Sequence, residues 1–367
     1  MQQIQIAYKN SPDFINRLLE LKNYYEDNSL QQMVFSITWS GDVKNKLENV
    51  IDKIEEIFPE CIYYGNEASG NIAAGDFSTG INVVCTIFEN KDSKAELVWV
   101  EKGTKVPSLN ALWNLCKTKK HLKGIELLPS LSYVEYLNID RDLPPISENV
   151  VIFGGTAHGY VLPCLYADVF AKGHPRTANG MVVVLWIGEN LHISQDYVLG
   201  WQGLGRLLTI NKANKKTIQM LDGSLPNEVY KKYLGGGMSQ SETYVFPLLV
   251  YEDDVEFLRT PYMFNEDGTL EMFVNLPENL QCRLSYGDMN TILENVHKSA
   301  EKFSEFRAEI IRTYSCAARR LFWGDGEVGK ETRILDGIAP VSGFYSGGEI
   351  LRFGNKLRIC NQTLSII

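Results

Sequence analysis

The sequence predicts a mixed α/β (α+β) fold of two related lobes, each a mixed sheet flanked by helices, with a ligand cleft between the lobes. Strand and helix patterns alternate near the start of the chain, in the order strand, helix, strand, turn, strand. A glycine-rich turn occurs twice, as GNEASGNI at residues 65–72 and as GFYSGGEI at residues 343–350. Glycine lets other groups approach the main chain, so two such turns predict N–H groups exposed around a small-molecule site. The alternative is two unrelated tight turns.

The N-terminal segment, residues 1–29, is expected to form a helix. Pro12 lies at a first-turn position, and Phe14, Leu18 and Leu21 fall on one face of a helix over 11–25. The first lobe, residues 30–222, then opens with a strand, a helix that ends before Pro59, and a short strand into the first glycine turn. Strands are expected at 33–39, 61–64, 81–88, 95–101 and 124–128, and helices at 43–58 and 109–121.

The rest of the first lobe is predicted to be mostly strands and glycine-rich loops. Strands are expected at 150–153, 161–170, 181–187, 191–198, 207–211 and 217–221, with a hairpin turn at 188–190. The segment GWQGLGR, residues 200–206, is expected to be a loop. It matches neither GxGxxG nor GxxxxGK[ST], so it supports nucleotide binding only weakly, although Arg206 could lie near an anionic group.

The second lobe, residues 223–367, is expected to start with a short helix over 227–233 and a mobile polar excursion over 235–242. Two strands, 244–251 and 269–276, should follow, the second after a hairpin turn at 265–268. The longest helix is expected from Asp288 to about Leu321, because apolar residues recur at helical spacing through that segment.

The composition excludes several classes of protein. A net charge of −9 and a pI near 5.3 argue against nucleic-acid binding. The longest apolar run, MVVVLWI at residues 181–187, is too short to span a bilayer, and no signal peptide is visible. Seven cysteines without a CxxC pair argue against a disulfide framework and a structural zinc site. A cytoplasmic protein without membrane insertion is expected.

Catalysis and cofactor binding are weakly supported. There is no GxSxG elbow, and no histidine lies near Cys316, which with Cys164 is the best-placed thiol. A structural role for these cysteines is therefore favoured over an enzyme that uses one of them. The histidines form no metal-binding ladder, so no metal or other cofactor is expected. One alternative stays open: His158 or His174, each in a loop, could be the axial ligand of a haem.

Polar groups embedded in apolar segments point to a ligand site. Arg319 could pair with a carboxylate, Glu349 could receive an ammonium group, and Tyr345 offers a ring and a hydroxyl, a set that suits an amino-acid-like zwitterion. The alternative is that Arg319 and Glu349 pair with each other. Gly155 and His158, in the segment GGTAHG, and Arg206 complete the candidate contacts: Gly155, His158, Arg206, Arg319, Tyr345 and Glu349.

Several of these motifs together resemble the FIST domains. GFYSGGEI at 343–350, followed by Asn361-Gln-Thr363, is similar to the C-terminal signature of that family, and YSCAAR at 314–319 to its cysteine–arginine segment. The segment from Leu221 to Gly235 resembles the join between the two halves of the family, and GNEASGNI resembles the first half's GxSSxGEI, with Asn71 in place of the usual Glu. The resemblance covers about residues 30–363.

The resemblance implies a sensory module that binds a small ligand, such as an amino acid, and acts on an output domain, for example a diguanylate cyclase or a histidine kinase. The apolar end LSII at 364–367 suggests the sensor part of a longer bacterial signalling protein. Some bacterial members are haem-binding nitric-oxide sensors, and eukaryotic relatives lie in F-box proteins. Haem binding, a protein-interaction role without a small ligand and a homodimer therefore stay open.

Overall fold

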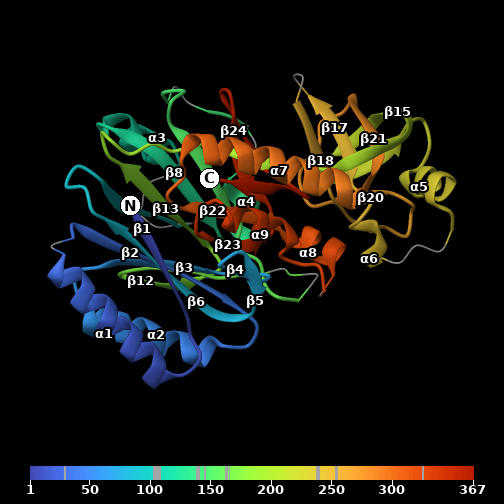
Figure 1. Ribbon diagram of the computed structural model, residues 1–367. Coiled ribbons are helices and arrows are strands. Elements are labelled where there is room, and N and C mark those ends of the chain that lie inside the picture. Colours follow the sequence, from blue (N-terminus) through green and yellow to red (C-terminus); the bar gives the residue numbers. More distant parts are fainter. Residues whose placement is uncertain are drawn as a thin grey trace.

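The computed structural model describes residues 1–28, 30–101, 109–137, 141–143, 146–161, 164, 166–236, 240–252, 255–324 and 326–367. Four sheets form the described part of the chain (Figure 1). In strand order they are sheet 1 (β1-β6-β2-β3-β11-β12), sheet 2 (β7-β13-β8-β10-β24-β25-β9), sheet 3 (β14-β26-β22-β23-β4-β5) and sheet 4 (β18-β17-β21-β15-β16-β20-β19). Sheets 1 to 3 each contain parallel and antiparallel pairs, which confirms the mixed α/β class.

Sheets 1 to 3 are built from one repeated unit, in the order helix, strand, helix, strand, hairpin, strand. Unit 1 consists of α1 (Ser11–Asp27), β2 (Gln32–Ser40), α2 (Lys44–Ile57), β3 (Ile62–Glu67), β4 (Asn71–Ala73), β5 (Asp76–Ser78) and β6 (Gly80–Phe88). Unit 2 consists of α3 (Leu109–Thr118), β8 (Leu122–Pro129), α4 (Leu131–Leu137), β10 (Val151–Gly155), β11 (Val169–Ala171), β12 (His174–Thr177) and β13 (Gly180–Ile187). Unit 3 consists of α7 (Met289–Phe306), β22 (Ile311–Cys316), α8 (Ala317–Trp323), α9 (Lys330–Asp336), β23 (Val341–Ser346), β24 (Glu349–Phe353), β25 (Lys356–Cys360) and β26 (Leu364–Ile366).

Each unit gives its hairpin to the sheet of another unit. Hairpin β4–β5 of unit 1 pairs with β23 in sheet 3, hairpin β24–β25 of unit 3 pairs with β10 in sheet 2, and hairpin β11–β12 of unit 2 pairs with β3 in sheet 1. The exchange is cyclic, so every sheet is completed by a different part of the chain. The two glycine turns noticed in the sequence are thus two of three related turns.

One glycine occupies the same register position in each unit. Gly65, Gly154 and Gly343 each lie on the strand before the hairpin and pair with a parallel neighbour. A Cβ at these positions would lie 2.3, 1.9 and 1.8 Å from the carbonyl oxygens of Ile37, Leu127 and Thr313, respectively. The close packing of these parallel strands therefore requires a residue without a side chain.

We predict that Gly154→Ala and Gly343→Ala each destabilise the protein strongly, by about 3 kcal/mol or more, because the new methyl group displaces main-chain atoms of the neighbouring strand. The measurement is the free energy of unfolding in urea. Gly236→Ala is the matched control, since a Cβ at Gly236 meets nothing within 4 Å. If Gly343→Ala is as stable as Gly236→Ala, the close packing of the parallel strands does not require a glycine at residue 343.

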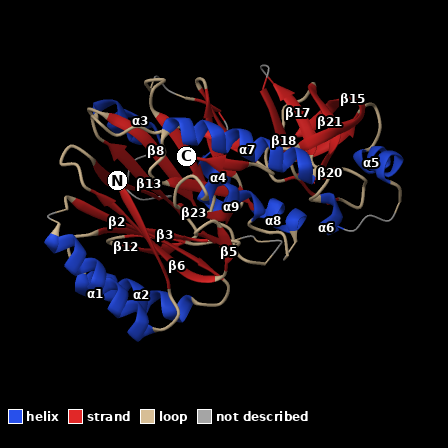
Figure 2. Ribbon diagram, viewed as in Figure 1, coloured by secondary structure: helices blue, strands red, loops and turns tan. Residues whose placement is uncertain are grey.

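Sheet 4 stands apart from the three units and lies with α5 and α6 at the right of Figures 1 and 2. All of its strand pairs are antiparallel. Its elements are β15 (Trp201–Asn214), β16 (Thr217–Leu221), α5 (Pro226–Leu234), α6 (Gln240–Thr243), β17 (Leu248–Glu252), β18 (Val255–Arg259), β19 (Pro261–Phe264), β20 (Leu270–Met272) and β21 (Leu280–Gly287). The lobe boundary expected at 222/223 falls between β16 and α5, inside the segment that forms this sheet.

The remaining strands extend the sheets of the units: β1 (Gln2–Ala7), β7 (Lys94–Glu101), β9 (Arg141–Asp142) and β14 (Asp196–Val198). The expected helix in residues 1–29 is present as α1, capped by the Asn10 side chain, which accepts from the N–H of Asp13. Its buried face is Phe14, Leu18 and Leu21, as the periodicity predicted. The strand β1 before it, which pairs with β6, was not expected.

The helix expected from Asp288 to Leu321 is wrong in its second half. Helix α7 ends at Phe306, where Arg307 adopts a left-handed conformation, and strand β22 follows. All six residues of β22 are buried. A strand buried on both faces shows no alternation, so its apolar residues continued the helical pattern by coincidence.

The loop expected at residues 200–206 is also wrong, because residues 201–206 belong to strand β15. The pairing of β15 with β21 shifts between Leu204 and Leu208, and Gly205 has a φ of 73°. Glycine in a strand often marks such a bulge. The predicted hairpin at 188–190 is wrong too: β13 pairs with β7 and β8, whereas β14 pairs with β26 in another sheet.

Four of the expected strands are shorter than predicted. In the described part of the chain, the segments 161–170, 191–198, 244–251 and 269–276 correspond to the strands Val169–Ala171, Asp196–Val198, Leu248–Glu252 and Leu270–Met272, respectively. The excursion expected over 235–242 includes residues 237–239, which lie outside the described part of the chain.

Candidate functional site

The three related turns meet in a closed ring of main-chain hydrogen bonds. The bonds are counted from the register glycines of the three units, Gly65, Gly154 and Gly343. The N–H of the residue four positions after each glycine donates to the carbonyl of the residue two positions after the glycine of another unit. The three bonds, each 3.0 Å long, run from Ser69 to Tyr345, from Gly347 to Thr156 and from His158 to Glu67. The two glycine turns predicted from the sequence therefore lie next to each other, and both halves of the chain contribute to one site.

A small cavity of about 30 Å³ lies between this ring and the segments around sheet 4. The units contribute His158, Cys316, Ala317, Ala318, Ser346, Gly347 and Asn361 to its lining, and the segments around sheet 4 contribute Tyr244, Thr260 and Phe273. The volume suffices for about one or two water molecules. A larger ligand requires the sheet 4 side to move away from the ring.

Glu349 lies behind the cavity wall and is fully buried. One carboxylate oxygen accepts from the hydroxyl of Ser346 at 2.6 Å, and the other accepts from the N–H of Thr363 at 3.3 Å. Gly155 pairs directly with Glu349 in the sheet. No salt bridge to Glu349 occurs within the described residues. Burial raises the pKa of Glu349 from 4.5 to about 8, although the two donors act to lower it.

His158 is buried beside Gly347 and is neutral at neutral pH. Desolvation lowers its pKa from 6.5 to about 4, with a further lowering by the charge of Arg320 that the hydrogen bond to Gly159 opposes. Its Nδ1 lies 2.7 Å from the carbonyl oxygen of Gly159. In the neutral ring this bond assigns the proton to Nδ1 and leaves Nε2 as an acceptor.

Two family models match the chain. The FIST N domain covers residues 34–224, and the FIST C domain covers residues 226–352. Together they span most of the sequence, including sheet 4 and the three units except for α1, β25 and β26.

The chain belongs to the FIST family. FIST domains are described as small-ligand sensory domains of signalling proteins. The junction of the two family domains lies close to the predicted boundary at 222/223. A search of the curated proteins gives no match.

Three of the predicted contacts, Gly155, His158 and Glu349, come together in this FIST protein at or directly behind the cavity. The side chain of Tyr345 does not line it, although its main chain belongs to the ring; the ring of Tyr345 packs against Phe77 instead. This division follows from strand alternation, because Tyr345 and Ser346 point to opposite faces of β23.

Arg319 and Arg206 are engaged elsewhere. Arg319 is fully buried and donates from Nε and Nη2 to Glu331, and from Nη1 to the carbonyl of Gln362. Its partner is therefore Glu331, and neither the free guanidinium nor the pairing with Glu349 considered above is seen. Arg206 pairs with Asp222 at the exposed surface of sheet 4, away from the cavity lining.

Cys316 lines the cavity, but its thiol is a poor nucleophile. Burial, together with the nearby charge of Glu349, raises its pKa to about 12. Cys316 lies at the end of β22, directly before α8, and the nearby charge of Arg319 lowers the pKa of the thiol only in part. Cys164 is half-buried, and its Sγ accepts from the N–H of Gly159.

The residues around His158 do not fit a haem. The cavity beside this histidine is about 30 Å³, and its walls are main chain of the hydrogen-bonded ring. His174 is exposed on β12, where its ring stacks on Trp99 at 4.9 Å. Within the described residues, no group of three or more His, Cys, Asp or Glu side chains is placed to hold a metal ion. No helix found there is long and apolar enough to cross a membrane.

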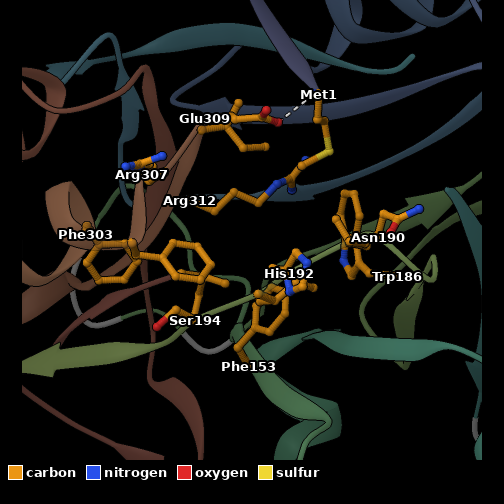
Figure 3. A pocket seen from close by; sticks show the side chains of 16 residues that line it. Met1, Phe153, Trp186, Asn190, His192, Ser194, Phe303, Arg307, Glu309 and Arg312 are labelled. Atoms are coloured by element: carbon orange, nitrogen blue, oxygen red, sulfur yellow. Dashed lines mark hydrogen bonds and ion pairs between the residues drawn. The ribbon is translucent and has the colours of Figure 1, made fainter. Parts of the chain in front are cut away.

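A larger pocket of about 290 Å³ lies at the other end of β22 (Figure 3). Arg312, near the start of β22, lines it, whereas Cys316 at the end of the same strand lines the small cavity. The sequence analysis missed this pocket, because its walls come from units 2 and 3 and from the first residue of the chain. A signal was present in Arg312 itself, an arginine inside an otherwise apolar segment.

Proposed function

We propose that this FIST protein is a sensory module whose ligand is a small amine, such as an amino acid, and that the ligand binds in the cleft beside Glu349. The observation that carries the proposal is the fully buried carboxyl group of Glu349, which has hydrogen-bond donors but no salt-bridge partner among the described residues. The charge of Arg319, which is paired with Glu331, lowers the pKa of Glu349 only in part. A ligand ammonium group would supply the missing positive charge and favour the ionised carboxylate.

The position of the cavity suits a sensor. Its lining comes partly from the ring of turns and partly from the segments around sheet 4, so the cavity lies where two parts of the chain meet. Arg259 donates to the carbonyl of Ile359, and Gln362 donates to the carbonyl of Tyr244. A ligand larger than water must separate these parts, so ligand binding favours an open arrangement over the closed one.

The same proposal extends to the setting of the protein. All seven cysteines are free thiols and six are buried, which supports a reducing, cytoplasmic compartment. The change between closed and open arrangements would act on an output domain or partner protein. The buried thiol of Cys316 supports a module without catalysis of its own.

The test is a thermal-unfolding screen of the twenty amino acids and simple amines at millimolar concentration, followed by calorimetry of any ligand that raises the midpoint. At pH 7 Glu349 is mostly protonated, so binding of an ammonium group should release most of a proton, about 0.9 per site. Calorimetry in phosphate and in Tris measures this release.

Glu349→Gln should abolish both the binding and the proton release, because an amide cannot ionise. Glu266→Gln, at an exposed hairpin position, is the matched control and should bind like the parent protein. A panel without any hit, or a hit that Glu349→Gln binds equally well, would refute the proposed contact.

A further inference from the structure

The pocket of about 290 Å³ has the size of a small-molecule site and is separate from the cleft beside Glu349. Most of its lining is apolar: Met1, Phe153, Trp186, Leu191, Ile193, Phe303, Phe306, Ala308, Ile310 and Ile367. Figure 3 shows these groups around Arg312, which extends toward Met1 and Trp186. An apolar pocket with one buried cation in its wall favours a ligand with an apolar body and an anionic group.

Arg312 is held rigidly, but one of its donors has no acceptor. Nη1 donates to the hydroxyl of Tyr64 at 2.9 Å and to Glu126 at 3.2 Å, and Nη2 donates to Thr86 at 3.0 Å. The guanidinium lies 4.9 Å from the centre of the Trp186 ring. Its Nε is buried without a hydrogen-bond partner. A buried N–H of a charged group without an acceptor is unfavourable, so a ligand oxygen gains binding energy when the pocket wall shifts enough for it to accept from this N–H, which solvent does not reach.

Among the described residues, the charged side chains around the pocket are paired except for that of Arg307. Glu309 and Glu89 share the amino group of Met1, at 2.6 and 3.1 Å, and Arg312 itself is paired with Glu126. Arg307, at the end of α7, is exposed, and Figure 3 places it at the side of Phe303. No carboxylate in the pocket lining is therefore free to repel an anion, and Arg307 would attract one.

We propose that this pocket binds amphipathic monocarboxylates, with an aromatic or aliphatic body against Phe153, Trp186 and Ile193 and the carboxylate accepting from Nε of Arg312. A single unmet donor matches a carboxylate better than a phosphate dianion, whose greater charge would be costly to remove from water in an apolar pocket. The proposal does not depend on the amine site beside Glu349.

The experiment is isothermal titration calorimetry of the full chain with sodium 2-naphthoate, compared with the neutral 2-naphthamide. We expect the carboxylate to bind at least ten-fold more tightly than the amide and to weaken with added salt, and Arg307→Gln to weaken the carboxylate about three-fold. Arg17→Gln, an exposed arginine on α1, is the control for a general loss of positive charge and should bind like the parent protein.

Arg312 also belongs to the protein core, where it pairs with Glu126, so its replacement destabilises the fold as well as the pocket. Ala308→Trp avoids this problem, because it fills the pocket from the half-buried position after Arg307 and leaves Arg312 in place. It should abolish naphthoate binding in a protein that still unfolds cooperatively. Equal affinity for acid and amide, undiminished binding to the Ala308→Trp variant, or no binding of naphthoate at 5 mM would each overturn the proposal. Glu349→Gln should bind naphthoate normally, which separates this test from that of the amine site.

Discussion

Replacing Glu349 by glutamine is expected to remove a loss of stability that the parent protein shows between pH 6.5 and pH 8.5. Burial raises the pKa of this carboxyl group to about 8 in the folded protein, whereas the unfolded chain titrates near 4.5. The folded state thus keeps a proton that the unfolded state has lost. The contribution of Glu349 to stability is highest below about pH 4.5, falls as the pH rises toward 8, and then stays low.

His158 acts in the opposite direction and in a different window. Its pKa is lowered from 6.5 to about 4, chiefly by desolvation, so its contribution is lost as the pH falls from 6.5 toward 4. Above pH 6.5 its contribution to the slope fades, although the histidine of the unfolded chain is still half protonated at pH 6.5. The buried cysteines and the amino group of Met1, whose pKa values are raised, add a further fall in stability toward pH 8.5. The part due to Glu349 is therefore the difference between the parent protein and Glu349→Gln. Between pH 6.5 and 8.5 the parent protein should lose about 2 kcal/mol of unfolding free energy through Glu349.

The measurement is urea denaturation at pH 6.5, 7.5 and 8.5. Glu349→Gln should lose about 2 kcal/mol less than the parent protein over this range, and the exposed Glu266→Gln should follow the parent protein. A parent profile parallel to that of Glu349→Gln would mean that the carboxyl is already ionised in the folded state, and it would also remove the main support for the amine site.

Breaking the buried ion pair between Glu126 and Arg312 is the second change for which we expect a large effect. The two groups lie 3.2 Å apart, with side chains 1% and 9% exposed, and the hydroxyl of Tyr314 donates to Glu126 at 2.7 Å. Glu126→Gln leaves the guanidinium buried without its counter-charge. The expected cost is about 3–5 kcal/mol of unfolding free energy.

A double-mutant cycle gives the sharper result. Arg312→Met alone should be similarly destabilising, but Glu126→Gln with Arg312→Met should cost clearly less than the sum of the two, because no unpaired charge remains. Urea denaturation of the four proteins measures the coupling. Asp222→Asn, which removes the partner of the exposed Arg206, is the control and should leave stability nearly unchanged. Additive costs in the cycle would mean that the pair is not coupled in the folded protein.

This ion pair illustrates how the repeated units have diverged. The three register glycines pair with Ile37, Leu127 and Thr313 on the neighbouring parallel strands. The residue directly before each of these partners is Ser36, Glu126 and Arg312, respectively. Equivalent positions of one structural unit therefore carry a hydroxyl, an acid and a base, and the acid and the base now neutralise each other in the core. The same position also places Arg312 at the wall of the larger pocket.

Local patterns were sufficient for much of the fold. The amphipathic spacing of Phe14, Leu18 and Leu21 predicted helix α1, and the glycine turns at 65–72 and 343–350 pointed to related segments that meet. The local sequence patterns gave wrong predictions where tertiary packing determines the secondary structure. Strand β22 is buried on both faces and so resembled a helix, and the glycines at 200–206 belong to a bulged strand instead of a loop.

The sequence by itself determined the mixed α/β class, the membership suggested by the FIST motifs, and the choice of Gly155, His158 and Glu349, because these depend on residue type and short-range spacing. Only the tertiary structure decided that the repeat occurs three times, that Arg319 pairs with Glu331, and that Arg312 lines a pocket. The cyclic exchange of hairpins explains the difference. It joins strands far apart in the chain, so the partner of a buried charge is set by pairing between units, and no local pattern records that pairing.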